Sequence, residues 1–167
     1  MKKRLLIYGI LLACLVFSGC SNHVSLGGRV TYSDDGTPLE QGTVAFYASN
    51  FLSRGEIRQD GRFVVGTQTD KDGLPPGTYQ VAITGAGQYI GDDQHGMPVT
   101  LPLIDDRYKD PERSNLTLTV TSSTKNYDLQ VDRAPEEIMQ RSRKLAVISP
   151  EESEERKRLR EEARTRN

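Results

Sequence analysis

The segment Glu-Ile-Arg-Gln-Asp-Gly-Arg-Phe-Val-Val, residues 56–65, is the local pattern that most clearly marks this chain as a β protein. It places two short runs, 56–59 and 62–65, on either side of Asp60-Gly61. An Asp-Gly pair favours a two-residue type I′ turn, because both central positions of that turn need positive φ. We therefore predict a β-hairpin at this point of the chain.

Five further runs rich in Val, Ile, Thr, Tyr and Phe are separated by clusters of Gly, Pro and Asp, which is the pattern of short strands joined by turns. They span residues 26–33, 43–48, 78–84, 116–121 and 127–131. Together with the hairpin they make seven strands within about 110 residues, which predicts an all-β sandwich. The remaining long segment, Gly85–Pro102, is predicted to be a polar loop, and loops of more than about 12 residues are uncommon unless they are functional or disordered.

Alternation within these runs predicts which side chains form the core. Each such buried side chain contributes about 1.5 to 3 kcal/mol, and the expected members are Val30, Phe46, Phe63, Tyr79, Val81 and Leu118. Four glycines are candidates for positive φ or for a close approach of two backbones, namely Gly28, Gly36, Gly61 and Gly77.

The order of these patterns resembles a known family. Gly28–Tyr32, Gly36–Leu39 and Gly42–Phe46 resemble the opening of a carboxypeptidase regulatory-like domain, and Asp60–Phe63, Asp72–Val81 and Ser114–Val131 resemble its continuation. The resemblance covers residues 25–132 and implies a seven-stranded transthyretin-like or Ig-like β-sandwich. In that family the module is an accessory or binding fold whose repeated residues are turn and core positions. The resemblance therefore implies no catalytic residues.

The N-terminus has the three parts of a secretory signal: a basic start, an apolar run over residues 5–17, and small residues before a cleavage point. Here the small pair Ser18-Gly19 is followed by Cys20. Phe17–Cys20 resembles the lipobox, which implies cleavage after residue 19 and lipidation of Cys20. Ser21 rather than Asp follows, which resembles lipoproteins sent to the outer membrane. A plain secretory signal and a retained anchor remain alternatives.

Removal of the predicted signal peptide, residues 1–19, leaves 148 residues and takes away Lys2, Lys3 and Arg4, so the formal charge falls from −1 to −4. A mildly acidic chain without a block of Lys and Arg argues against nucleic acid as a partner. Cys14 leaves with the signal and Cys20 is expected to be lipidated, so no thiol remains for a disulfide or a nucleophile. Residues 20–25 are predicted to be a lipidated tether, and 26–132 the sandwich.

An enzymatic function finds no support in the residue pattern. A related hydrolase of the transthyretin-like fold uses histidines and a C-terminal Tyr-Arg-Gly-Ser, which this chain lacks. Zinc peptidases space their ligands on one helix face, but His23 and His95 are followed three places on by Leu26 and Pro98. We predict no catalytic residue, no cofactor and no metal ligand.

Two weaker ligand patterns are present. Asp70-x-Asp72-Gly73 has the first spacing of a calcium loop, without its later ligands, and two acidic pairs lie in predicted loops at 92–93 and 105–106. The aromatic rings of Tyr89 and Tyr108 are expected to be exposed, where they can stack on sugars. The predicted function is thus a membrane-anchored envelope lipoprotein that acts as a non-catalytic binding or structural module. The alternative is a carbohydrate- or cation-binding accessory subunit of an envelope enzyme or transporter, acting through Gly85–Asp110.

Residues 133–167 form a charged tail that is predicted to be helical or disordered. One helix is expected from Pro135 to about Ile148, docked on the sandwich through Ile138, Met139, Leu145 and Ile148. A second begins at Ser149, where Ser as N-cap, Pro next and Glu152 three places on make a capping box. Pairs at i,i+4 such as Glu152 and Arg156 favour a solvated helix, and a partner-binding element is the other interpretation.

Overall fold

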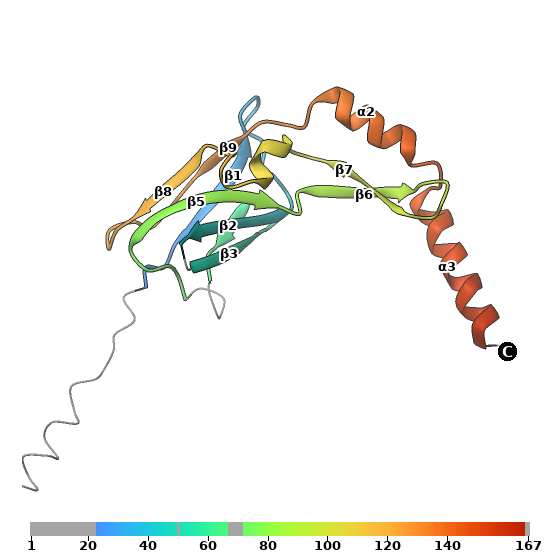
Figure 1. Ribbon diagram of the computed structural model, residues 1–167, viewed down its shortest axis with the longest axis horizontal. Helices are drawn as coiled ribbons and strands as arrows, with labels where there is room; N and C mark the ends of the chain where they lie inside the picture. Colours follow the sequence, from blue (N-terminus) through green and yellow to red (C-terminus); the bar gives the residue numbers. More distant parts are fainter. Residues whose placement is uncertain (1–22, 50, 67–71, 166–167) are drawn as a thin grey trace, which may run out of the picture.

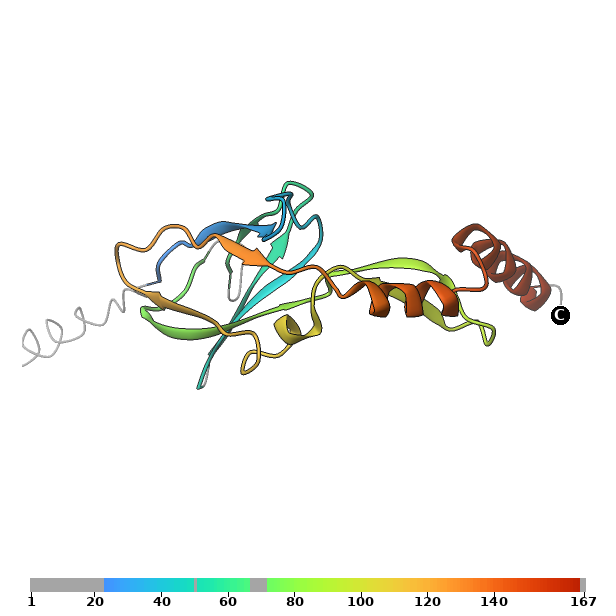
Figure 2. The same ribbon diagram turned by 90° about the horizontal axis from the view of Figure 1, so that it is seen from above.

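The computed structural model describes residues 23–49, 51–66 and 72–165, and the predicted signal peptide and Cys20 lie outside this range. Two sheets form a sandwich, and a separate arm extends from one of its ends (Figures 1 and 2). The strands of the sandwich are β1 (Gly27–Tyr32), β2 (Gly42–Ala48), β3 (Phe51–Ile57), β4 (Arg62–Val64), β5 (Gly77–Thr84), β8 (Leu116–Val120) and β9 (Leu129–Val131). The remaining elements are β6 (Gly87–Asp92), β7 (Pro98–Pro102), the 3₁₀ helix η2 (Asp106–Lys109), α2 (Glu136–Leu145) and α3 (Pro150–Thr165).

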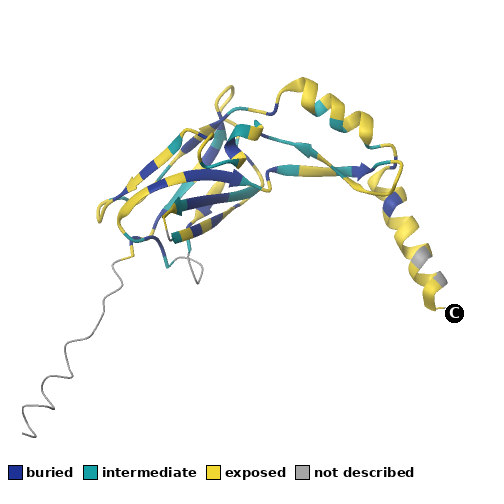
Figure 3. Cartoon of the chain, viewed as in Figure 1, coloured by how far each residue is buried: buried dark blue, intermediate teal, exposed yellow. Residues whose placement is uncertain are grey.

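The predicted all-β sandwich is confirmed. One sheet has the order β4-β1-β9 and the other β3-β2-β5-β8. All neighbours are antiparallel except β1 and β9, which run parallel. All six predicted core side chains are buried, and buried residues gather between the two sheets whereas the helices are mostly exposed (Figure 3). The ring of Phe46 is fully buried at the centre, with the rings of Phe63 and Tyr127 each 6.2 Å away between centroids.

The turn at residues 56–65 is not of the predicted type. Gly61 has φ of 80°, but Asp60 does not have positive φ, so the turn is not type I′. The amide of Gly61 donates to Arg58 O at 2.7 Å and the amide of Arg58 donates to Arg62 O at 2.9 Å, which makes a three-residue connection. A type I turn followed by a left-handed residue is the usual form of such a connection.

The two strands joined by this turn also separate. β3 pairs with β2 in the four-stranded sheet, whereas β4 pairs with β1 in the three-stranded sheet. The turn is therefore a corner between the layers as well as a hairpin, and it brings residue 58 beside the edge of the smaller sheet.

Close backbone approach explains one of the candidate glycines. A Cβ at Gly28 would lie 2.0 Å from the carbonyl oxygen of Tyr127, so any side chain there would push β1 from the segment that leads into β9. Gly36, like Gly61, has positive φ. The prediction for Gly77 is wrong, since it has neither positive φ nor a neighbour closer than 3.6 Å to an added Cβ.

The predicted polar loop Gly85–Pro102 is instead a two-stranded hairpin, β6 and β7, which adds two strands to the predicted seven within the described residues. It is antiparallel, with a register shift between Tyr89 and Gly91. The hairpin leaves the sandwich and α2 runs beside it, contacting β7 (Figure 2). We call β6, β7, α2 and α3 the arm.

The two predicted helices are present, and the tail is helical from Glu136 to Leu145 and from Pro150 to Thr165. The prediction that α2 docks on the sandwich is wrong, because α2 packs against β7 of the arm. Leu145, one of the predicted docking residues, is 53% exposed. Ser149 caps α3 as predicted, with its Oγ accepting from the amide of Glu152 at 3.2 Å. The Glu152 carboxylate pairs with Arg156 at 2.7 Å. Within the described residues, neither helix is long and apolar enough to cross a lipid bilayer.

Candidate functional site

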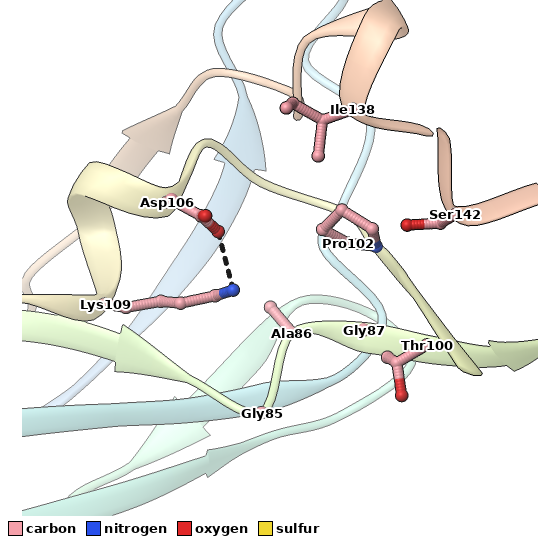
Figure 4. A pocket seen from close by; sticks show the side chains of 9 residues that line it. All are labelled: Gly85, Ala86, Gly87, Thr100, Pro102, Asp106, Lys109, Ile138 and Ser142. Carbon is pink, nitrogen blue, oxygen red and sulfur yellow. Dashed lines mark ion pairs between the residues drawn. The ribbon is translucent and has the colours of Figure 1, made fainter. Parts of the chain in front are cut away.

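A cleft lies where the arm joins the sandwich, between the start of β6, the end of β7, η2 and α2 (Figure 4). Its volume is about 480 Å³, which is within the range of small-molecule sites. Most of its lining comes from Gly85–Asp110, the segment that the sequence predicted as a candidate ligand site, and α2 supplies the rest. The lining residues are Gly85, Ala86, Gly87, Thr100, Pro102, Asp106 and Lys109, together with Ile138 and Ser142 of α2.

The chemistry of this cleft is mixed. Lys109 Nζ is paired with Asp106 Oδ1 at 2.6 Å on one wall. Thr100 and Ser142 supply hydroxyl groups, and the side chains of Pro102 and Ile138 supply apolar surface. Such a lining can hold a small polar ligand by hydrogen bonds.

A second cluster holds the distal end of the arm together, and it is centred on Asp92. This residue closes β6 and is only 7% exposed. Its backbone amide donates to Ile148 O at 3.0 Å, and its carbonyl accepts from the amides of Val147 and Ile148. Its carboxylate accepts from Tyr89 Oη at 2.8 Å and from the hydroxyl of buried Ser153. Asp92 therefore joins the hairpin to both the α2–α3 connection and α3.

Gly91 makes this contact possible. A Cβ on Gly91 would lie 2.1 Å from Ile148 O, and its φ of 129° belongs to a conformation that glycine favours. The connection before α3 can thus lie directly against the hairpin backbone.

The environment of Asp92 favours its ionised form. The hydroxyl of Ser153 and then that of Tyr89 hold the pKa of the carboxyl below its usual value, with smaller contributions from Lys157 and Arg156. A lowered pKa in the folded state means that the stabilisation is present above the usual aspartate value of about 4. It is lost as the pH falls through the lowered pKa, so we expect the contact between Asp92 and α3 to weaken only in acid.

Replacing Asp92 with asparagine should loosen α3. The amide is neutral and keeps one acceptor oxygen where the carboxylate offers two, so the hydroxyls of Tyr89 and Ser153 both lose a charge-assisted hydrogen bond. We expect hydrogen exchange of the α3 amides to accelerate by about tenfold or more while exchange in β2 and β5 is unchanged. Ser153→Ala should produce the same effect, because it removes the hydroxyl that donates to the Asp92 carboxylate.

Glu155→Gln is the matched control, because Glu155 is exposed on the same helix and loses the same charge. Equal exchange in Asp92→Asn and in the control would show that Asp92 does not hold α3. The effects of Asp92→Asn and Ser153→Ala should not add in the double variant, since both remove one shared contact.

Tyr108, predicted to be exposed and available to sugars, is buried at 4% exposure, so that prediction is wrong. Its hydroxyl accepts from Arg107 at 2.7 Å and from the amide of Asp132 at 3.2 Å. Arg107 also pairs with the Asp132 carboxylate. Tyr89 is exposed, as predicted, with 38% of its surface accessible. Its hydroxyl donates a hydrogen bond to the Asp92 carboxylate.

The other predicted candidates lie apart from one another. His95 and Asp93 are in the turn of the β6–β7 hairpin, where Asp93 Oδ1 accepts from the amides of His95 and Met97. Asp105 caps η2 by accepting from the amide of Arg107. His23 lies at the opposite end of the sandwich, and Asp70 lies outside the described residues. Across the described ranges, no three His, Cys, Asp or Glu side chains lie close enough together to hold a metal ion.

Sequence reasoning missed Ser153 and undervalued Asp92. Ser153 lies among charged residues near the start of α3, and only the tertiary contact gives it a role. An acidic residue beside glycine in a polar segment is typical of a turn, so Asp92 carried no signal of burial.

No protein family model and no curated protein sequence matches this chain. Among solved structures, the chain is similar to the crystal structure of BcpA*(D312A), the major pilin subunit of Bacillus cereus, with 10% sequence identity and a TM-score of 0.39. The similarity covers 68% of this chain and 30% of that chain, so this chain spans less than a third of the pilin subunit.

Proposed function

We propose that this protein is an envelope lipoprotein, anchored through acylated Cys20, whose transthyretin-like seven-stranded sandwich is a non-catalytic module that presents the arm to a partner. The observation that carries the proposal is the placement of the two ends. The first described residues, His23 and Val24, lie at one end of the sandwich, and the arm leaves from the other end (Figure 1).

The contacts at the entry end are specific. The amide of Val24 donates to Leu74 O at 2.7 Å, and the amide of Leu74 donates back at 3.0 Å. Cys20 is four residues before Val24, a distance of at most about 14 Å for an extended chain. An acyl group at Cys20 thus holds this end of the sandwich near the bilayer and directs the arm away from it.

The exposed surface of the arm suits a partner in the envelope. Met97, Val147 and Leu159 are each about 60% exposed on the hairpin turn, the α2–α3 connection and α3. A partner that covered these side chains would remove their apolar surface from water, which is favourable. Deleting residues 133–167 should therefore remove co-purifying envelope proteins while the anchored sandwich remains.

Mass spectrometry of the protein purified from membranes tests the anchor directly. The N-terminal peptide should begin at Cys20 and carry the added mass of a diacylglycerol, with or without an amide-linked acyl chain. An unmodified peptide that begins at Cys20 or Ser21 would instead indicate a plain secretory signal, and one that retains residues 1–19 a membrane anchor.

A sugar-binding accessory role is the second candidate, and the cleft between the hairpin and α2 favours it because Gly85–Asp110 supplies most of its lining. Titration calorimetry with envelope polysaccharide fragments tests this role. Ser142→Ala should weaken binding if the cleft is the site, and absence of heat with every fragment would count against the role.

A further inference from the structure

The outer face of the smaller sheet carries a row of three arginines that the proposed function does not use. Arg29 in β1 lies directly opposite Arg62 in β4, and Arg58 is hydrogen-bonded to Arg62 across the connection between β3 and β4. The three residues line one cleft of about 510 Å³ together with Asn126 and Asp128.

This arrangement is unfavourable without a counter-charge. Directly opposed residues on antiparallel strands point to the same face with Cα atoms about 4.5 to 5.5 Å apart, and like charges in such pairs destabilise the sheet. The cleft has three cationic side chains against one lining carboxylate, in a chain whose overall formal charge is −1.

The neighbouring acids compensate only in part. Asp60 Oδ2 is 3.7 Å from Arg62 Nε, and the other oxygen of Asp60 accepts from the Arg62 amide at 3.0 Å. Arg29 Nε donates to a neutral backbone carbonyl, Asp60 O, while Asp128 accepts from the Arg29 amide. Arg58 lines the cleft and is exposed, and its guanidinium has no ion pair with another described residue.

We propose that this cleft binds an oxyanion with at least two charged groups, such as a diphosphate or a polycarboxylate. Guanidinium groups match phosphate and carboxylate oxygens in bidentate hydrogen bonds. Arg29 and Arg62, which are opposite each other in register, would hold one charged group between them, and Arg58, next to Arg62 across the connection, would contact a second. The cleft volume is that of a small-ligand site. The inference is independent of lipidation at Cys20 and of the arm.

Titration calorimetry of the full chain in non-ionic detergent tests the proposal, with inorganic pyrophosphate, citrate and inorganic phosphate as ligands. We expect pyrophosphate or citrate to bind, and Arg62→Gln to weaken that binding by about tenfold or more, which corresponds to the loss of one charge-assisted hydrogen bond. Arg58→Gln should weaken pyrophosphate binding more than phosphate binding, because it removes the contact for the second group.

Arg141→Gln is the matched control, because Arg141 is exposed on α2 and the substitution removes the same charge far from the cleft. Binding to this variant should change by less than about twofold. Thermal unfolding should show that Arg62→Gln has nearly the stability of the parent, since loss of the like-charge contact with Arg29 offsets loss of the exposed ion pair with Asp60. Absence of binding by both multivalent ligands, or an equal loss in Arg62→Gln and Arg141→Gln, would overturn the proposal.

Discussion

Replacing Cys20 with alanine should move the protein almost completely from the membrane pellet to the soluble fraction. Burying each methylene of an acyl chain contributes about 0.8 kcal/mol, so one chain binds a bilayer reversibly whereas two or three hold it stably. Without the thiol no diacylglycerol can be attached, and the folded sandwich that follows the tether has no membrane-spanning helix within its described residues. Fractionation of cells followed by immunoblotting measures the distribution.

Cys14→Ala is the matched control. This residue lies in the predicted signal peptide, so cleavage after residue 19 would leave a mature protein identical to the parent. The control should therefore stay in the membrane pellet. If Cys20→Ala also stayed there, with its signal segment removed, an arm-bound partner rather than a lipid would be holding the protein.

The strands of the sandwich could be predicted because each has one face in a common core. In β5, Tyr79, Val81 and Ile83 alternate with Thr78 and Gln80, and all three are buried. A strand with one buried face has apolar residues at every second position. This alternation is visible in the sequence and does not depend on the order of the strands in the sheets. The alternation does not indicate which sheet a strand joins. β3 and β4, for example, are adjacent in sequence but belong to different sheets.

The β6–β7 hairpin could not be predicted by the same reasoning. It lies outside the sandwich and packs partly on α2, so Gln88, Tyr89 and Thr100 are exposed and apolar alternation is lost. Its glycines, which are typical of loops, are needed for close contacts: Gly91 against Ile148 O is one. A segment whose partner lies about 50 residues further along the chain carries little local signal of its structure.

The candidate sites show the same limit. The contact between Asp92 and Ser153 joins residues 61 positions apart, and neither residue type indicates it. The arginine row is likewise a product of register, since Arg29 meets Arg62 only because β1 pairs with β4. By contrast, the Ser149 cap of α3 is a local interaction, and its pattern in the sequence was sufficient to predict it.

Replacing Phe46 with alanine should cost about 3 to 5 kcal/mol in the free energy of unfolding, which is the usual range for deleting a fully buried phenylalanine ring. Phe46 has no exposed surface, and its ring contacts those of Phe63 in the opposite sheet and Tyr127 in the segment leading to β9. The cavity would lie between the sheets, where strands on both sides are fixed by their ladders and cannot close it. Denaturant unfolding followed by circular dichroism measures the loss, which approaches the whole stability of many small domains.

Leu52→Ala provides the control for this prediction. Leu52 is in β3, the neighbour of β2 in the same sheet, but it is 38% exposed, so its truncation leaves no closed cavity and should cost less than about 1 kcal/mol. Phe46→Leu should fall between the two, because leucine refills part of the volume. Similar losses for Phe46→Ala and Leu52→Ala would mean that the two sheets do not pack on Phe46. In that case the burial that supports the sandwich, and with it the position of the arginine row on its outer face, would have to be reconsidered.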